Sequence, residues 1–321
     1  MRVLSGIQPS GALHIGNYFG ALKQFIELQH RYDGLYFVAN LHALTSLHDA
    51  AALRAATLEV AVSFLALGLD PTVATIFVQS DVPEVTELTW LLACVTPVGL
   101  LERCHAYKDK VAQGIAAEHG LFTYPVLMAA DILIYDSHLV PVGQDQKQHV
   151  EVTRDLAERF NSRYDQEVFV IPEPLILEEV AVIPGLDGRK MSKSYGNTID
   201  IFDEPALLKK KIMSLKTDSA PVEAPKDPDI SNIYQLFRLF APEPEQSEMR
   251  ARFQQGGVGY GDLKKRTVEL AGDYFAEARE KRRDLLAHPE HVREILAAGA
   301  AHARSLARVT LDRARDACGI W

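Results

Sequence analysis

The sequence predicts an α/β protein in which a doubly wound parallel sheet is followed by an all-helical C-terminal domain. Short apolar, strand-like segments alternate with longer helical segments in the first part of the chain. Such alternation is typical of parallel sheets whose strands are joined by crossover helices. Further along, the apolar periodicity is helical throughout. We therefore expect an α/β domain over residues 1–189 and a helical domain over residues 190–321, which is compatible with a length of 321 residues.

Four strands are expected in the first domain, each short and rich in apolar residues. They span residues 3–7, 35–39, 74–79 and 139–142. The segments between them have apolar residues at helical spacing, most clearly over residues 15–26, 50–67 and 145–160. Gly68, with Pro71 just beyond, ends the second of these helices. Strands and helices in this order predict crossover helices packed on one parallel sheet.

The C-terminal part is expected to be helical. Apolar residues recur at helical spacing over residues 206–215, 230–240, 262–287 and 290–317. Between the first two segments, Pro221, Pro225 and Pro228 interrupt any regular element. These prolines predict an irregular, exposed connection.

Composition limits the classes of protein to which the chain can belong. Apolar residues make up 47% and charged residues 24%, which is ordinary for a soluble globular protein. No apolar run is expected to span a membrane, and the N-terminus enters a strand directly, without a signal peptide. Cys94, Cys104 and Cys318 lack the spacing of metal ligands. We therefore expect a reduced, cytoplasmic protein without structural zinc or an iron–sulfur cluster.

The charge is negative overall but unevenly distributed. A net charge of −9 argues against a protein that coats nucleic acid without specificity. Lys and Arg nevertheless outnumber Asp and Glu within residues 187–216, 264–283 and 302–321. Solvated helix faces account for most such runs, and contact with a specific nucleic acid is the other interpretation.

The loop over residues 185–196 is the most informative stretch of the chain. Lys190 and Lys193 are separated there by a methionine and a serine and are flanked by glycines, which makes a mobile cationic clamp. Such a clamp suits a triphosphate whose negative charge grows as pyrophosphate leaves. Because two lysines at this spacing also occur on ordinary exposed loops, a second element must decide between the two interpretations.

That second element begins at His14 and ends at Asn17, with the sequence His-Ile-Gly-Asn. It follows the first strand and opens the first helix, at the edge where doubly wound sheets bind ligands. Gly11 and Gly16 let the backbone approach a nucleotide, and the helix N-terminus offers N–H groups to an anion. Neither a Walker A loop nor a Gly-x-Gly-x-x-Gly motif is present, which disfavours kinases and dehydrogenases. Together with the lysine loop, this element predicts an ATP site.

A third group of residues predicts an apolar pocket with one polar contact. Tyr124, Met128 and Asp131 share one face of a helix that Pro125 can begin. A carboxylate on an apolar stripe is unfavourable to bury unless it accepts a hydrogen bond. Asp131 therefore either lies at the solvent edge of the helix or awaits a ligand donor such as an indole N–H or a phenol O–H.

These motifs resemble those of the class I aminoacyl-tRNA synthetases. The elements at residues 14–17 and 190–194 look like the family's two signature motifs, HIGH and KMSKS. Segments 5–11, 124–133 and 140–149 are similar to the bacterial tryptophanyl branch, and the resemblance covers essentially the whole chain. It implies a Rossmann-like catalytic domain that activates L-tryptophan with ATP and Mg²⁺, followed by the lysine loop and a helical domain that binds the tRNA-Trp anticodon.

The resemblance implies roles for the nucleotide-binding residues. Lys190 and Lys193 would neutralise the pyrophosphate, and His14 would stabilise the transition state. Lys110 could add a third cation or be a solvated helix residue, and Asp145 could equally be a helix N-cap. The residues that the resemblance assigns to ATP binding are Gln8, Pro9, Ser10, Gly16, Asn17, Gly143, Gln144, Asp145, Ile183, Lys190, Met191, Ser192, Lys193 and Ser194.

The resemblance also implies a pocket for the tryptophan side chain. Asp131 would accept the indole N–H, while Tyr124 and Gln146 would hold the α-amino group. His42 would line the slot or be a histidine satisfied at a strand end. Tyrosyl-tRNA synthetases place Tyr and Asp at the same spacing but carry Gln between them, where this chain has Met128. The apolar residues expected to line the slot are Leu4, Met128, Val140 and Val142.

The expected partners are L-tryptophan, tRNA-Trp and a second copy of the chain, with no DNA and no membrane. Three alternatives remain open. A tyrosyl-tRNA synthetase is the chemical neighbour. A small nucleotidyltransferase would share the first motif but would need neither the lysine loop nor the helical domain. A catalytically silent relative that senses tryptophan or binds a partner is the third, and the intact lysines disfavour it.

Overall fold

The fold is seen in a computed structural model that describes residues 1–104, 118–143, 146–176 and 183–321. The chain forms two compact units, each built from separate stretches of sequence. The first, called the sheet unit below, comprises Met1–Gly11, Gln24–Glu178 and Leu285–Trp321. The second, called the motif unit, comprises Ala12–Lys23 and Glu179–Asp284.

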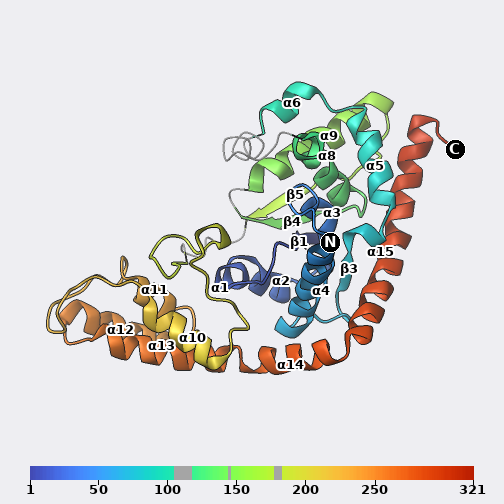
Figure 1. The fold of residues 1–321 in the computed structure, drawn as a ribbon. Coiled ribbons are helices and arrows are strands. Elements are labelled where there is room, and N and C mark those ends of the chain that lie inside the picture. Colours follow the sequence, from blue (N-terminus) through green and yellow to red (C-terminus); the bar gives the residue numbers. More distant parts are fainter. Residues whose placement is uncertain (105–117, 144–145, 177–182) are drawn as a thin grey trace. The chain divides into compact units, whose positions relative to one another are not determined.

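Within the described residues, five parallel strands form one sheet in the order β3-β2-β1-β4-β5 (Figure 1). The strands are β1 (Arg2–Ile7), β2 (Asp33–Val38), β3 (Thr75–Val78), β4 (Leu139–Val142) and β5 (Glu173–Ile176). The register pairs Leu4 with Leu35 and Leu35 with Thr75. The strand order switches between β1 and β4, and ligands bind at such switch points in α/β sheets. The predicted doubly wound parallel sheet is therefore confirmed.

The fifth strand, β5, is absent from the sequence prediction. It contains Pro174, and a proline in a strand interior removes one donor from the ladder. β5 lies at the edge of the sheet, beside β4, and edge strands tolerate proline. A proline that argues against a central strand is thus compatible with an edge strand.

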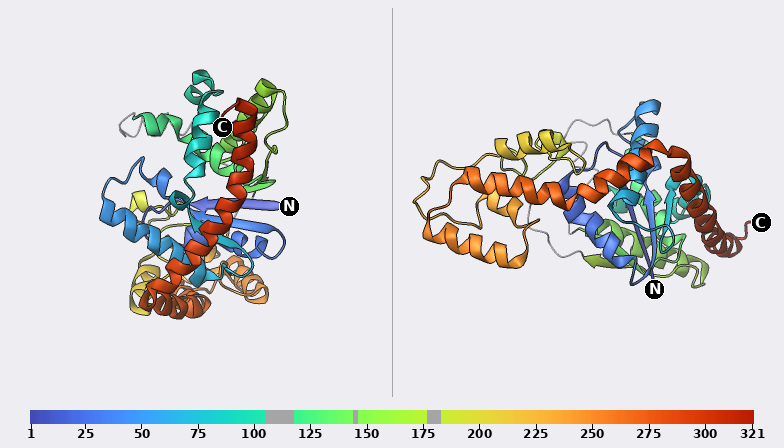
Figure 2. Two further views of the ribbon diagram at one scale, coloured as in Figure 1. Left: turned by 90° about the vertical axis from the view of Figure 1, so that its right-hand side faces the viewer. Right: turned by 90° about the horizontal axis from the view of Figure 1, so that it is seen from below.

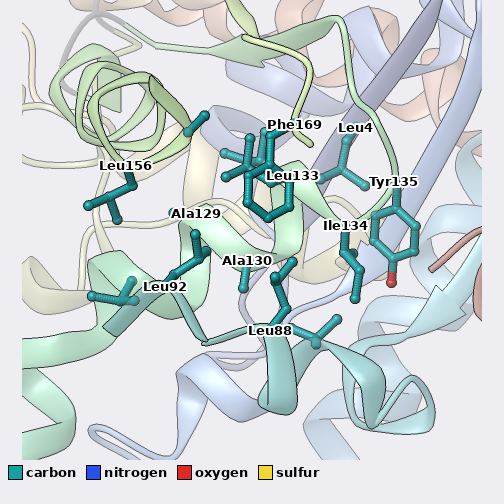
Figure 3. Packing of buried hydrophobic residues seen from close by; sticks show 14 of the residues in the cluster. Leu4, Leu88, Leu92, Ala129, Ala130, Leu133, Ile134, Tyr135, Leu156 and Phe169 are labelled. Carbon is teal, nitrogen blue, oxygen red and sulfur yellow. The ribbon is translucent and has the colours of Figure 1, made fainter. Parts of the chain in front are cut away.

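Helices cover the sheet. Those of the sheet unit are α3 (Asn40–Ala43), α4 (Ala50–Leu67), α5 (Glu84–Ala93), α6 (Val98–Glu102), α8 (His119–Leu133), α9 (Lys147–Tyr164) and α15 (Pro289–Cys318), and α2 (Lys23–Leu28) follows the motif unit's first stretch. Buried residues of α5, α8 and α9 form one apolar cluster with the strands. Figure 3 shows Leu88 of α5, Leu133 of α8 and Phe169 within that cluster. This core packs α8, the helix that carries Tyr124 and Asp131, against the sheet.

Two helices of the sheet unit differ from expectation. α8 begins at His119, so that Pro125 lies inside the helix and does not start it. By length and composition alone, α4 could cross a membrane, although no such run was expected from the sequence. Residues 60–66 of α4 are buried in the sheet unit, and packing in a soluble core accounts for their apolar character.

The C-terminal helix α15 belongs to the sheet unit. It packs against β3 and α5, as Figures 1 and 2 show. Gly299 permits this close approach, because a Cβ there would lie 1.9 Å from a carbonyl oxygen of β3. Glu84 of α5 is 9% exposed and accepts hydrogen bonds from Arg304 and Arg308 of α15. Each compact unit is therefore formed by stretches that are separate in the sequence. The predicted boundary at residue 189 between a catalytic and a tRNA-binding domain stays a prediction.

The motif unit is largely helical. It contains α1 (Ile15–Asn17), a π-helical segment (Tyr18–Leu22), α10 (Pro205–Ser214), α11 (Asn232–Phe237), α12 (Glu243–Gln255), α13 (Tyr260–Tyr274) and α14 (Ala276–Ala287). The helix predicted over residues 262–287 is therefore two helices, and α12 is an addition to the prediction. The break falls at Phe275, whose ring lies 5.1 Å from that of Tyr18 and joins a buried cluster with Phe19 and Phe240. Burial of this ring accounts for the interruption.

Candidate functional site

The two signature-like motifs lie together in the motif unit. Ile15 N–H donates to the carbonyl of Ile199 at 2.9 Å, and Ile201 N–H donates to the carbonyl of Leu13 at 3.1 Å. The His14 motif is thereby tied to the chain segment that follows the lysine loop. A Cβ on Gly16 would lie 3.6 Å from the Cβ of Met191, in the middle of the lysine motif. The fold thus joins two motifs that are far apart in sequence.

The lysine loop is a short hairpin whose backbone is hydrogen-bonded to the side chain of Asn197. This side chain is 2% exposed, and its Oδ1 accepts the Ser192 N–H at 2.8 Å. Its Nδ2 donates to the Lys190 carbonyl at 3.2 Å and to the Asp187 carboxylate at 2.7 Å. The turn of the hairpin has Gly188 at φ +85°, a left-handed conformation that glycine adopts readily. The loop was expected to be a mobile clamp, but Asn197 forms hydrogen bonds to its backbone on both sides of Met191.

The electrostatics of the motif unit keep His14 neutral. Burial, and after it the nearby Lys193 ammonium, lowers the His14 pKa from its usual 6.5 to about 4, although Asp200 opposes this. Burial also lowers the pKa of Lys193, again against Asp200. The His14 Nδ1 is buried without a hydrogen-bond partner in the described part of the chain. A neutral imidazole beside a half-buried lysine can offer hydrogen bonds to phosphate oxygens without adding a second charge.

The sheet unit carries the Asp131 carboxylate that the sequence singled out. This carboxylate is 2% exposed, so the alternative that it lies at the solvent edge of α8 is wrong. His42 donates from Nε2 to Oδ2 of Asp131 at 2.9 Å. Gln79, which follows β3, donates from Nε2 to both carboxylate oxygens, at 2.9 and 2.8 Å. Sequence reasoning missed Gln79, and its position after a strand at the ligand-binding edge is the one signal that could have found it.

The residues expected to line the tryptophan slot are buried or packed against buried residues. Leu4, Val140 and Val142 are buried in the core cluster, and Met128 packs against that cluster. The tryptophan-site predictions for these residues remain predictions, because burial alone does not identify a ligand.

Tyr124 lies near the same carboxylate on α8. Its hydroxyl and His149 Nε2 are 2.7 Å apart, and its ring lies 6.2 Å from that of His42. Burial raises the pKa of the Tyr124 hydroxyl to about 12, so that it stays protonated. Gln8 donates to the His42 carbonyl at 3.3 Å, which places Gln8 beside His42 within the sheet unit.

Several predicted residues are distributed between the two units. Gln8, Pro9, Ser10 and Gly143 belong to the sheet unit, whereas His14, Gly16, Asn17, Ile183 and residues 190–194 belong to the motif unit. Gln146 precedes α9 as its N-cap residue. The predictions made for Lys110, Gln144 and Asp145 concern positions outside the described residues.

Comparisons with known proteins agree with this geometry. The family described as tRNA synthetases class I (W and Y) matches residues 1–276. The chain is 54% identical to the tryptophan–tRNA ligase of Fusobacterium nucleatum, covering 99% of this chain and 98% of that protein. It is 55% identical to the tryptophan–tRNA ligase of Rhodopirellula baltica, with both chains covered in full.

A solved structure is similar over the whole length. The crystal structure of tryptophanyl-tRNA synthetase from Campylobacter jejuni in complex with ADP and tryptophan has 52% sequence identity and a TM-score of 0.93, with all of both chains covered. The motifs in the motif unit, the buried carboxylate in the sheet unit and these matches agree with one another. The chain therefore belongs to the class I tRNA synthetases of the W and Y family.

Proposed function

We propose that the protein is a tryptophan–tRNA ligase, which activates L-tryptophan with ATP and transfers it to the 3′ end of tRNA-Trp. The observation that carries this proposal is the buried Asp131 carboxylate on α8, a helix whose apolar residues belong to the core cluster. A carboxylate accepts an indole N–H, and a site built for that bond discriminates strongly against side chains that lack it. The relatives named tryptophan–tRNA ligase support the same substrate.

The first step joins the tryptophan carboxylate to the α-phosphorus of ATP and releases pyrophosphate. This chain's residues contribute position and charge, because the transfer needs little covalent participation by the protein. Lys190 and Lys193 would neutralise the leaving pyrophosphate, with Asn197 holding the loop that carries them. His14, neutral because its pKa is about 4, would donate a hydrogen bond to a phosphate oxygen and would not act as a cation.

Magnesium would enter with the nucleotide as Mg·ATP. Among the described residues there is no cluster of His, Cys, Asp or Glu that could hold a metal ion by itself. Mg²⁺ keeps several waters and commonly binds through substrate phosphates. The phosphate oxygens of ATP would therefore be the main ligands of Mg²⁺. The ion and the lysine loop would together neutralise the negative charge of the phosphates.

In the second step, a hydroxyl of the terminal tRNA ribose attacks the adenylate and releases AMP. We assign tRNA binding to the helical part of the motif unit, where residues 264–283 of α13 and α14 carry an excess of Lys and Arg. Phosphate contacts by such residues make binding strongly dependent on salt. Anticodon recognition by these helices is accordingly part of the proposal.

A homodimer in the cytoplasm completes the proposal. On the sheet unit, Trp90 of α5 is 69% exposed and Val98 of α6 is 63% exposed, and a second copy of the chain would cover these apolar side chains. Cys94, Cys104 and Cys318 are all free thiols, in agreement with a reducing compartment. Light scattering on the purified protein should give twice the mass of one chain, and a monomer at micromolar concentration would contradict the dimer.

Exchange between ATP and pyrophosphate tests the first step. We expect exchange that depends on tryptophan, with tyrosine supporting much less of it, because the phenol hydroxyl would have no second polar partner beside the apolar Met128. Lys193→Ala should reduce exchange strongly, whereas Lys209→Ala on α10, an exposed lysine outside the loop, should not. Exchange with tyrosine but not tryptophan would identify the tyrosyl alternative, and no exchange with any amino acid would favour the silent relative.

A further inference from the structure

The carboxamide of Gln79 is a buried group with a fixed orientation. It is 1% exposed, and its Oε1 accepts the Leu41 N–H at 2.9 Å. Because an N–H must meet an acceptor, this bond determines which end of the amide is oxygen. The Nε2 end therefore faces Asp131, where it donates to Oδ1 at 2.9 Å and Oδ2 at 2.8 Å. Gln79 thus connects the backbone after β2 to the carboxylate on α8.

The bonds to Asp131 are unequally divided between its oxygens. Oδ2 accepts from both Gln79 and His42, whereas in the described residues Oδ1 accepts from Gln79 alone. An ionised carboxylate offers about four acceptor positions, two on each oxygen. Oδ1 consequently keeps more capacity for a further donor. Its partners also leave Asp131 little freedom to rotate, since Nε2 of Gln79 contacts both oxygens.

We propose that Gln79 is a positioning residue for substrate selection: it orients the Asp131 carboxylate so that Oδ1 accepts the ring N–H of the amino-acid substrate. Gln79 thereby controls discrimination between side chains that carry a ring N–H and isosteric side chains that lack it. This inference rests on the proposed function, because it takes tryptophan as the occupant of the slot. It concerns the selectivity of that site and assigns Gln79 no contact with the reacting atoms.

A merely structural role for Gln79 has different consequences, and the chain offers a matched control. Gln29 is 2% exposed, and its Nε2 donates to the carbonyls of Ile26 and Gly68, each at 3.0 Å. Its Oε1 accepts the Asp70 N–H at 2.8 Å. Gln29 therefore has the same burial and a similar set of bonds, but it connects backbone groups away from Asp131.

The test compares Gln79→Met with Gln29→Met in the full-length protein. For each variant, kcat/KM in ATP–pyrophosphate exchange is measured with tryptophan and with its benzothiophene analogue, in which sulfur replaces the N–H. Gln79→Met should lower the tryptophan-to-analogue ratio about tenfold, as expected when a charge-assisted bond loses its alignment, while KM for ATP changes less than twofold. Gln29→Met should leave the ratio unchanged even if it lowers the melting temperature. A Gln79→Met ratio within twofold of wild type would overturn the proposal.

A second variant, Gln79→Glu, gives a readout that depends on pH. It preserves the length of the side chain but sets a carboxyl group against Asp131, and two adjacent carboxyl groups favour sharing one proton. As the pH rises from 6 to 9, loss of the shared proton would leave two adjacent negative charges and remove the hydrogen bond that orients Asp131. The tryptophan-to-analogue ratio of this variant should therefore fall over this range, whereas the wild-type ratio stays constant. A flat profile in Gln79→Glu would contradict the proposal, even if Gln79→Met does not fold. Absence of tryptophan activation by wild type would instead refute the proposed function itself.

Discussion

Replacement of Asp131 by Asn is the most informative perturbation of the pocket. The side chain keeps its size and position on α8, so that the apolar slot is undisturbed. One carboxylate oxygen, however, becomes an NH₂ group. Because Gln79 donates to both oxygens and His42 donates to Oδ2, either orientation of the new amide sets its NH₂ against the Gln79 Nε2 donor. A ligand N–H then competes for the single oxygen that remains.

The magnitude follows from these bonds. A buried donor without a partner costs about 1–3 kcal/mol, and hydrogen bonds to charged groups contribute about 1.5–3 kcal/mol. Since Asp131 is 2% exposed, water does not replace the lost acceptor. We take about 3 kcal/mol for loss of the charged acceptor to the ligand, which corresponds to roughly a 100-fold decrease in kcat/KM for tryptophan.

The assay is ATP–pyrophosphate exchange at varied tryptophan concentration. Asp131→Asn should raise KM for tryptophan and leave KM for ATP within about twofold, because the phosphate-binding motifs lie elsewhere in the chain. Leu127→Met, a substitution on α8 that conserves apolar volume outside the predicted slot, serves as the control and should change kcat/KM less than about fivefold. An Asp131→Asn enzyme within threefold of wild type would refute the role of the carboxylate in binding the indole.

Three further predictions concern the motif unit and the C-terminal helix. Asn197→Ala should lower kcat of exchange at least tenfold with KM for tryptophan unchanged, since it frees the lysine loop. Asn161→Ala, which removes a half-buried amide that binds backbone groups of the sheet unit, should not. Because the His14 pKa is lowered from 6.5 to about 4 in the folded protein, the unfolded chain binds a proton more readily, and the free energy of unfolding should decrease as the pH falls from 6.5 towards 4. Urea denaturation should show a smaller decrease over this range for His14→Asn than for wild type. Glu84→Gln should lower unfolding free energy by about 1–2 kcal/mol at pH 7, measured in urea, because two half-exposed arginines lose their charged partner.

Much of the fold is predictable because its signals are local. The predicted strands and the helices over residues 50–67 and 290–317 follow from short apolar runs and helical periodicity. Pro125 was expected to begin the helix of Asp131 but lies within α8, and the strand β5 was not predicted from its sequence. The break at Phe275 depends on aromatic neighbours that are distant in sequence.

The site divides in a similar way. Lys190, Lys193 and His14 are predicted from sequence because the two motifs that contain them resemble the signature motifs of the family, and their roles stay predictions. Asp131 can be singled out because a carboxylate interrupts an apolar helical stripe. Gln79 and Asn197 have no such pattern, since an isolated amide is compatible with any surface. Their contacts depend on the folded chain: Gln79 bonds to Asp131 of α8, and Asn197 bonds to the backbone of the lysine hairpin.

Aminoacylation with purified transcripts is the most direct test of the central claim. Wild-type protein, Mg·ATP and radiolabelled tryptophan should charge a bacterial tRNA-Trp transcript, and Asp131→Asn should do so far more slowly. Labelled tyrosine with a tRNA-Tyr transcript should give no product above background. Charging of tRNA-Tyr with tyrosine, or failure to charge tRNA-Trp while the protein is folded, would contradict the account.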